Sequence, residues 1–192
     1  MKAFRIIVAS LLLAGAGLPA APVSAQPYLG FGAGTADYDR GNAVPDLITS
    51  GNFDGDASGF KIYGGFRFHP NFAAELAYMD LGNAKYSGTF AGAPVTGGSL
   101  ETTGLNVSAV GIVPLSPAFE LFGKIGIFGW ESKARDTTSG VPFSGKADDS
   151  DVSFGLGANF NLNRNLSLRA EWERLKAVGD IDLYTAGLLF RF

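Results

Sequence analysis

Six charged side chains lie in segments that are otherwise apolar or rich in small residues, and they are the residues most able to do chemistry. Each occupies a position between aliphatic and aromatic residues, so all six share the opposite face of an extended chain. They are Lys61, Arg67, Glu75, Lys124, Arg169 and Glu171, and Glu120 and Arg191 are candidates to join them near one end. Such a face can form ion pairs that fill an enclosed space, or it can line a path for ions or protons.

Burial determines what these charges require. An unpaired buried charge costs several kcal/mol, so either role needs Glu75 and Glu171 to pair with the bases around them. We favour a structural ion-pair network over a gated pore or a proton path. Trp130 has the same parity as Lys124, which predicts a β-bulge near the end of that strand.

The sequence predicts no catalytic residue. The only histidine, His69, lies in the turn Phe68-His69-Pro70-Asn71. No serine, cysteine or acid lies in obvious reach of it, whereas a dyad or triad needs a base held against a nucleophile. We therefore expect His69 to be a turn residue.

Cofactor and metal sites are also not predicted. Gly30, Gly32 and Gly34 lack the third spacing and the helix of a dinucleotide fingerprint, and they suit the inner face of a strand. The acidic stretches at 54–56 and 148–151 could hold Ca²⁺, but neither matches an EF-hand loop. Solvated acidic segments are the simpler interpretation.

Strands must position these residues, because a period of two dominates the chain after residue 26. Phe60, Ile62 and Phe66 alternate with polar or small residues. Short turns at 69–71, 114–117 and 161–165 separate pairs of such segments. Longer segments rich in Gly, Asp, Ser and Thr, at 39–57, 82–100 and 133–150, are predicted to be loops, and a fourth connection near 176–180 is brief. The pattern predicts eight antiparallel strands, from about residue 27 to the end.

The first 25 residues have the features of a secretory signal peptide. Lys2 and Arg5 precede an apolar run from Ile6 to Ala16, and Val23-Ser24-Ala25 is a small-residue cleavage site. Residues 26–192 would then form one domain, with 13 basic against 18 acidic residues. An acidic balance gives no reason to expect nucleic acid. The sequence has no cysteine, so backbone pairing and packing alone must hold an exported chain.

The distribution of aromatic and small residues favours a membrane-spanning barrel. Phe68, Phe72, Phe119, Phe160 and Phe192 lie beside the short turns, and Phe60, Tyr78, Trp172 and Tyr184 lie towards the opposite end. Two such rings mark the interfaces of a membrane barrel. The opposite face is rich in glycine, which suits a narrow eight-stranded interior. The main soluble alternative is a lipocalin-like barrel with its apolar face turned inward to bind a ligand.

Several motifs resemble the OmpA-like transmembrane barrel family. They are Tyr28-Leu29-Gly30-Phe31-Gly32-Ala33-Gly34, the stretch from Asn71 to Gly82 (NFAAELAYMDLG), Leu168-Arg169-Ala170-Glu171-Trp172 and the terminal Phe192. The resemblance implies an eight-stranded up-and-down barrel in the outer membrane of a Gram-negative bacterium. It also implies that Phe192 is the signal read by the barrel-assembly machinery. The peptidoglycan-binding domain of longer members does not follow, so we do not carry over cell-wall tethering.

We therefore expect an integral outer-membrane β-barrel with a structural or surface-interaction role, an interior filled by side chains and no enzyme activity. Its partners would be outer-membrane lipids and the barrel-assembly machinery, and the long segments could bind extracellular ligands. The first alternative is a narrow porin-like channel for ions or small solutes. A soluble lipocalin-like ligand binder and a barrel enzyme are weaker alternatives.

Overall fold

The computed structural model describes residues 26–38, 48–54, 56–90, 93–136, 143–177 and 180–192. The predicted signal peptide lies outside the described residues. The strands are β1 (Gln26–Tyr38), β2 (Ile48–Asp54), β3 (Asp56–His69), β4 (Phe72–Phe90), β5 (Ala93–Ser116), β6 (Phe119–Asp136), β7 (Phe143–Asn161), β8 (Leu166–Lys176) and β9 (Asp180–Arg191). None of the described residues forms a helix that is long and apolar enough to cross a membrane.

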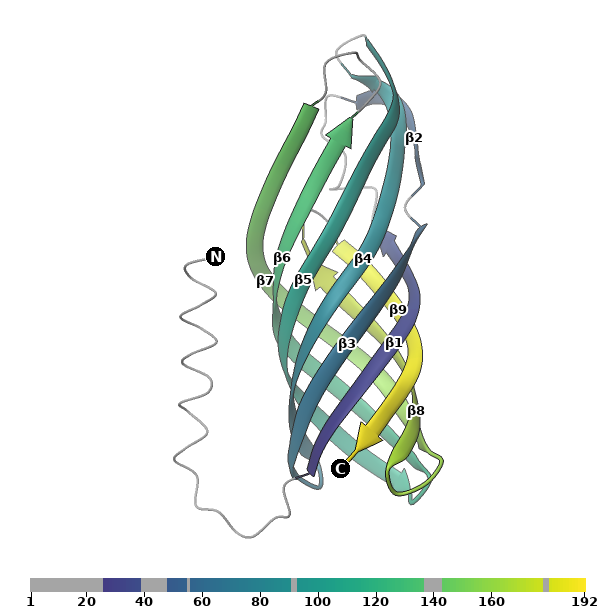
Figure 1. Cartoon of the computed structure of the whole chain (residues 1–192), viewed down its shortest axis with the longest axis vertical. Coiled ribbons are helices and arrows are strands. Elements are labelled where there is room, and N and C mark those ends of the chain that lie inside the picture. Colours follow the sequence, from purple (N-terminus) through teal and green to yellow (C-terminus); the bar gives the residue numbers. More distant parts are fainter. Residues whose placement is uncertain (1–25, 39–47, 55, 91–92, 137–142, 178–179) are drawn as a thin grey trace.

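The strands form a closed antiparallel barrel, because the first strand pairs with the last. β1 pairs with β3 on one side and with β9 on the other, from Tyr28↔Arg191 to Tyr38↔Ile181. β2 and β3 both pair with β4 and share one position in the wall, so the barrel has eight strand positions. The predicted fold class is confirmed. Figure 1 shows the start of β1 and the C-terminus at the same end, here called the turn end.

The apolar face of the strands points outward. Leu29, Ile125 and Leu156 are 53%, 62% and 61% exposed, whereas their neighbours of opposite parity point into the barrel. The rings of exposed aromatic residues flank this apolar band, with Phe72 and Phe160 near the turn end and Tyr78 and Tyr184 towards the other. An apolar exterior with aromatic rings fits a lipid environment. The lipocalin-like alternative is wrong, since it requires the apolar face to point inward.

Two inner-face glycines make room for tyrosine rings on the neighbouring strand. A Cβ atom at Gly30 would lie 2.3 Å from the ring of Tyr63, and one at Gly65 would lie 2.1 Å from the ring of Tyr28. Because β1 and β3 are paired neighbours, each tyrosine covers a glycine on the adjacent strand. A larger residue at either position would push a tyrosine into the interior.

The predicted loops at 82–100 and 133–150 are wrong over most of their length. β4 and β5 continue to Phe90 and from Ala93, and β6 and β7 continue to Asp136 and from Phe143. These extensions form a tall wall at the end opposite the turns, here called the hairpin end (Figure 1). They lack a clean apolar alternation, because strands above a membrane have no lipid to face. Backbone pairing with their neighbours holds Gly- and Ser-rich segments that have low strand propensity.

The predicted bulge near Trp130 is also wrong. β6 keeps one register with β7 along its whole length, and its pairing with β5 shifts only between Pro114 and Ser116. Trp130 simply points inward, and it is buried. A bulge does occur in β4 between Asp80 and Asn83, where Gly82 adopts a φ of 71°. Glycine suits this left-handed conformation because it has no Cβ.

The outward-facing band predicts a position-dependent cost for a charged substitution. Leu76 lies on the exposed face of β4 between Phe72 of one aromatic ring and Tyr78 of the other, and Leu76→Arg should lower the free energy of unfolding by about 2–4 kcal/mol. Val152→Arg, at the midpoint of β7 and on the hairpin-end side of the exposed Phe154, is the control and should cost at most about 1 kcal/mol. Denaturant unfolding in lipid vesicles measures both. Equal costs at the two positions would contradict this placement of the membrane.

Candidate functional site in the barrel interior

A central cluster of charged side chains crosses the interior of the barrel. Its members come from four strands and are all buried: Lys61 from β3, Glu75 from β4, Lys124 from β6, and Arg169, Glu171 and Glu173 from β8. The Lys124 Nζ lies 2.5 Å from Glu171 Oε1, 2.6 Å from Glu173 Oε1 and 3.2 Å from Glu75 Oε1. This ammonium therefore contacts all three carboxylates of the cluster.

The other two bases complete the pairing. Arg169 contacts Glu75 through Nη1 at 2.9 Å and Glu171 through Nε at 3.1 Å. Lys61 forms ion pairs with Glu171 and Glu173. The central cluster thus balances three bases against three acids, which is the condition for keeping these charges out of water.

Five of the six predicted residues meet in this central cluster, and Arg67 does not. Glu173 belongs to the cluster but was missed by the sequence reasoning. The signal that could have found it is simple, because Glu173 is two residues beyond Glu171 on the same strand and shares its parity. A strict reading of alternation along β8 would have included it.

A second ion cluster lies nearer the turn end and contains Arg67. Arg67 Nη1 lies 2.9 Å from Glu120 Oε1, and Arg191 Nη2 lies 3.1 Å from Glu120 Oε2. Arg191 also donates to the hydroxyl of Ser167 at 2.5 Å, and the Arg67 Nε donates to the carbonyl of Pro70 at 3.2 Å. Glu120 therefore bridges two arginines. Each arginine is also held by a further hydrogen bond, Arg191 to Ser167 and Arg67 to Pro70.

Aromatic side chains pack around the central cluster and orient Arg169. Its guanidinium carbon lies 4.5 Å from the centre of the Tyr63 ring and 4.1 Å from that of Phe122. Such cation–π contacts favour a cation that has lost its hydration. Tyr28 donates a hydrogen bond of 3.1 Å to Glu75 Oε2. These rings leave little room for Arg169 to change its partners.

A mostly apolar layer lies in the interior beyond the central cluster, on the side of the hairpin end, where the buried hydroxyls of Thr102 and Ser132 also pair at 2.8 Å. Met79, Phe128 and Leu175 follow Glu75, Lys124 and Glu173 along strands that run away from the turn end, so they lie farther from it. With Leu81, Ile181 and Leu183 they are among the most deeply buried side chains among the described residues. Sequence reasoning missed this layer, because it expected the whole inner face to be polar or small.

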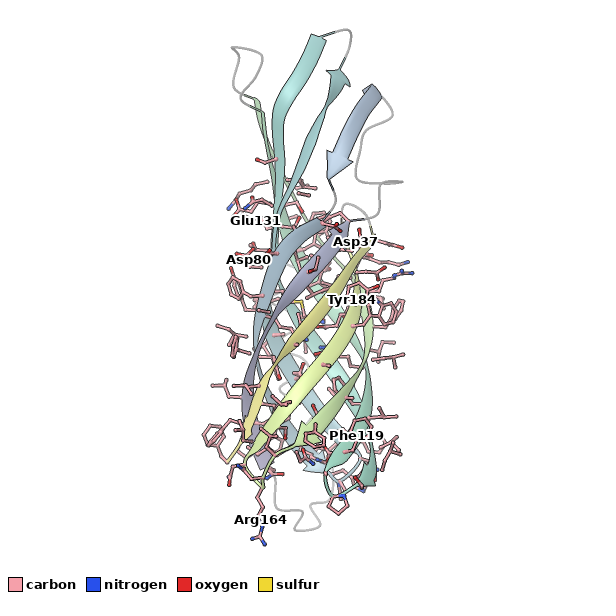
Figure 2. The ribbon with its side chains drawn as sticks, turned by 90° about the vertical axis from the view of Figure 1, so that its right-hand side faces the viewer. Asp37, Asp80, Phe119, Glu131, Arg164 and Tyr184 are labelled. Atoms are coloured by element: carbon pink, nitrogen blue, oxygen red, sulfur yellow. The ribbon has the colours of Figure 1, made fainter. Side chains whose placement is uncertain are left out.

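Polar residues occupy the outer face at the same level, so the polarity of the wall inverts there. Figure 2 shows Asp37, Asp80 and Glu131 in the upper part of the barrel, and Arg164 and Phe119 at the turn end. Arg174 pairs with Asp182 at 2.5 Å, and Trp172 Nε1 donates to Asp182 at 3.1 Å. An apolar interior with a polar exterior is the arrangement of a barrel in water, so this level marks where the wall leaves the lipid.

Two cavities lie at the turn end. An open cavity of about 430 Å³ is lined by Arg67, Glu120, Arg164 and Arg191 among others. Deeper in, a cavity of about 20 Å³ reaches Tyr28 and Arg169, which is room for about one water molecule.

The residues weighed for catalysis and metal binding do not converge. His69 Nδ1 accepts a hydrogen bond of 3.1 Å from the backbone N–H of Asn71, as in a turn. Within the described part of the chain, no group of three or more His, Cys, Asp or Glu side chains could hold a metal ion.

Comparison with known families identifies the barrel. The OmpA-like transmembrane domain family matches residues 22–187. The chain belongs to this family. This OmpA-like barrel is therefore a protein of the outer membrane, as predicted from the sequence. A search among curated proteins finds no match.

Solved structures of small outer-membrane barrels share the fold of the OmpA-like barrel. Ail, the attachment invasion locus protein of Yersinia pestis, has a TM-score of 0.59 at 14% identity, with 88% of this chain and 99% of that chain covered. OprG of Pseudomonas aeruginosa has a TM-score of 0.60 at 11% identity, covering 88% and 94% of the two chains. Neisserial surface protein A has a TM-score of 0.50 at 16% identity, covering 88% and 96%. At these identities the likeness concerns the fold alone.

The central cluster predicts that Glu75 is needed for stability. Glu75→Ala removes a carboxylate that pairs with both Lys124 and Arg169. It should therefore lower the free energy of unfolding by about 3–5 kcal/mol. The control is Glu131→Ala, which removes a partly exposed pair with Lys133 and should cost at most about 1 kcal/mol. Both are measured by denaturant unfolding in vesicles. A cost for Glu75→Ala no larger than that of the control would show that the central cluster is not a paired network.

Proposed function

We propose that this OmpA-like barrel is a closed structural element of the outer membrane whose hairpin end serves as a binding surface. The observation that carries the proposal is the two-layered interior. The central cluster occupies the cross-section of the barrel, and the apolar layer of Met79, Phe128, Leu183 and their neighbours lies beyond it. Passage of an ion would require breaking the ion pairs and then crossing the apolar layer without hydration.

The principal alternative is a narrow channel, and conductance separates the two functions. In planar bilayers, the purified protein should give no steady single-channel steps. Glu75→Ala shortens one side chain of the central cluster but leaves the apolar layer intact, so it should remain silent as well. Steady steps from the unmodified protein, or steps that begin only with Glu75→Ala, would favour the channel.

An enzymatic role has no support in the chemistry of the described residues, and we propose that the barrel has none. The only histidine of the sequence, His69, is exposed in a turn where its Nδ1 already accepts a backbone hydrogen bond. A general base must be within reach of a nucleophile or an activated water. The buried carboxylates are all paired with bases and lie away from the open cavity, apart from Glu120.

We place the hairpin end outside the cell and the turn end in the periplasm. In bacterial outer-membrane barrels with an even number of strands, the short turns and both chain termini lie on the periplasmic side. The chain has no cysteine, so single substitutions can be labelled without background. Asp148→Cys, at the hairpin end of β7, should react with an impermeant maleimide on whole cells. Ser116→Cys, beside the turn at the end of β5, should react only after permeabilisation, and the reverse pattern would contradict this orientation.

The charge of the hairpin end favours cationic ligands over anionic ones. Ail has been crystallised with the heparin analogue sucrose octasulfate, so a barrel of this fold can bind a polyanion. Among the residues of this chain whose exposure the structure describes, the exposed charged side chains towards the hairpin end are mostly acidic: Asp37, Asp56, Asp148, Asp149 and Asp151, against Lys133 and Lys176. We therefore propose that any extracellular ligand carries positive charge.

Phe192 is proposed as the signal for the barrel-assembly machinery. Its ring is 66% exposed at the turn end and lies 5.2 Å from that of Phe190 in an edge-on contact. Phe192→Ser should lower the amount of assembled barrel in cells several-fold and leave refolding into detergent unchanged. Phe160→Ser, which removes another exposed aromatic residue at the same end, is the control. Equal loss with both variants would mean that the aromatic ring matters and not the terminal position.

A further inference from the structure

Among the described residues, β7 has a neighbouring strand on only one side near the hairpin end. It pairs with β6 from Phe143 to Phe160, but its pairing with β8 begins only at Ser153↔Leu175, since β8 ends at Lys176. Residues 143–152 therefore form an open strand edge above the level of β8. In Figure 1, β7 stands at the margin of the tall wall, with β6 on its other side.

The backbone groups on this open edge can be identified from the hydrogen bonds at the other end of β7. The N–H of Asn161 donates to Ala118 beside β6 at 2.8 Å, whereas the N–H of Leu162 donates to Leu166 at the start of β8 at 2.9 Å. Because β7 keeps an unbroken register with β6, the alternation carries through, and even-numbered residues point away from β6. Ser150 and Val152 thus present their N–H and C=O groups to the open edge.

A side chain already caps one of these groups. The N–H of Ser150 donates to Asp149 Oδ1 at 2.8 Å, in place of a ladder bond to a neighbouring strand. An exposed strand edge is a template for pairing with another chain, and charges on it restrict which chains can pair. The Asp149 carboxylate therefore restricts which strands can pair with this edge.

The charges beside the edge select the kind of strand that could be added. Asp149 and Asp151 are exposed and two residues apart, so they share one face of β7. If a second copy of this chain paired antiparallel about Ser150, Asp149 of each copy would face Asp151 of the other, and like charges on paired strands are destabilising. A strand with basic residues at every second position would place a cation opposite each acid.

We propose that the open edge of β7 binds an extended basic peptide segment by strand addition. A lysine or arginine of the segment forms an ion pair with the Asp149 carboxylate, which frees the N–H of Ser150 to donate to a carbonyl of the added strand. A second base pairs with Asp151 on the same face. This inference rests on the proposed function, because it places the edge at the exposed hairpin end, and it names the chemistry of the partner.

The first test removes the edge donor and keeps the barrel. Ser150→Pro deletes an N–H that takes no part in the ladder with β6, and proline is tolerated on such an edge. Ser150→Ala, the matched control, keeps the N–H. The probe is a fluorescent, end-capped peptide of alternating lysine and valine, titrated against the barrel in nanodiscs of zwitterionic lipid. Ser150→Pro should weaken binding about tenfold or more, and Ser150→Ala should leave it unchanged. Far-UV circular dichroism checks that both variants stay folded.

The second test separates strand addition from simple charge attraction. Asp149→Asn with Asp151→Asn should weaken binding about fivefold and reduce its salt dependence. Asp37→Asn, which removes an exposed acid on β1, should have no effect. The same peptide with N-methylated valines keeps its charge but cannot join a ladder, so it should not bind. Sucrose octasulfate should not bind either.

Clear outcomes would overturn the inference. Equal binding by Ser150→Pro and Ser150→Ala, or full binding of the N-methylated peptide, would mean that the peptide binds by ion pairing and not by strand addition. Sedimentation that shows self-association abolished by Ser150→Pro would make a second copy the occupant. None of these results changes the expected conductance of the barrel, so a failure here is distinguishable from a failure of the proposed function.

Discussion

Closure of the ladder between β1 and β9 is the constraint on which the rest of the structure depends. In lipid, an unpaired backbone group costs several kcal/mol, so a sheet can cross the membrane only if its first and last strands meet. That seam requires close approach: a Cβ at Gly34 would lie 1.8 Å from the carbonyl oxygen of Tyr184, and one at Gly187 would lie 1.9 Å from that of Phe31. Glycine at these two positions therefore permits the pairing that removes both edges.

Closing eight strands also creates a narrow interior whose contents must be satisfied without water. The chain solves this in two ways along one axis. Within the lipid, where the exterior is apolar, it pairs Lys61, Lys124 and Arg169 with three glutamates. Beyond the lipid, it fills the interior with Met79, Phe128 and other apolar side chains, as a soluble barrel would. The interior therefore changes from ion pairs to apolar side chains at the level where the surroundings of the wall change from lipid to water.

Much of this architecture could be predicted from the sequence, because alternation is a strong signal wherever one face meets lipid. The parity of Glu75, Lys124 and Arg169 placed them inside, and the structure brings them together. Parity also applied to Glu173, which was overlooked. The extensions of β4 to β7 could not be predicted in the same way. No regular apolar alternation marks them, and Gly, Ser and Asp in these segments have the composition of loops. The pairing of Arg67 with Glu120, and not with the central cluster, depends on strand tilt, which a sequence pattern does not contain.

The inversion of polarity along the wall also fixes the immersion depth of the barrel. If the barrel rose, the exposed leucines and phenylalanines near the turn end would stay in lipid, but Tyr184 and Phe154 would enter water. If it sank, Asp80 and the Arg174–Asp182 pair would enter hydrocarbon. Either displacement is unfavourable, so in a bilayer of the wrong thickness the lipid must deform and not the protein. The barrel should therefore respond to bilayer thickness by thinning or thickening the lipid around it.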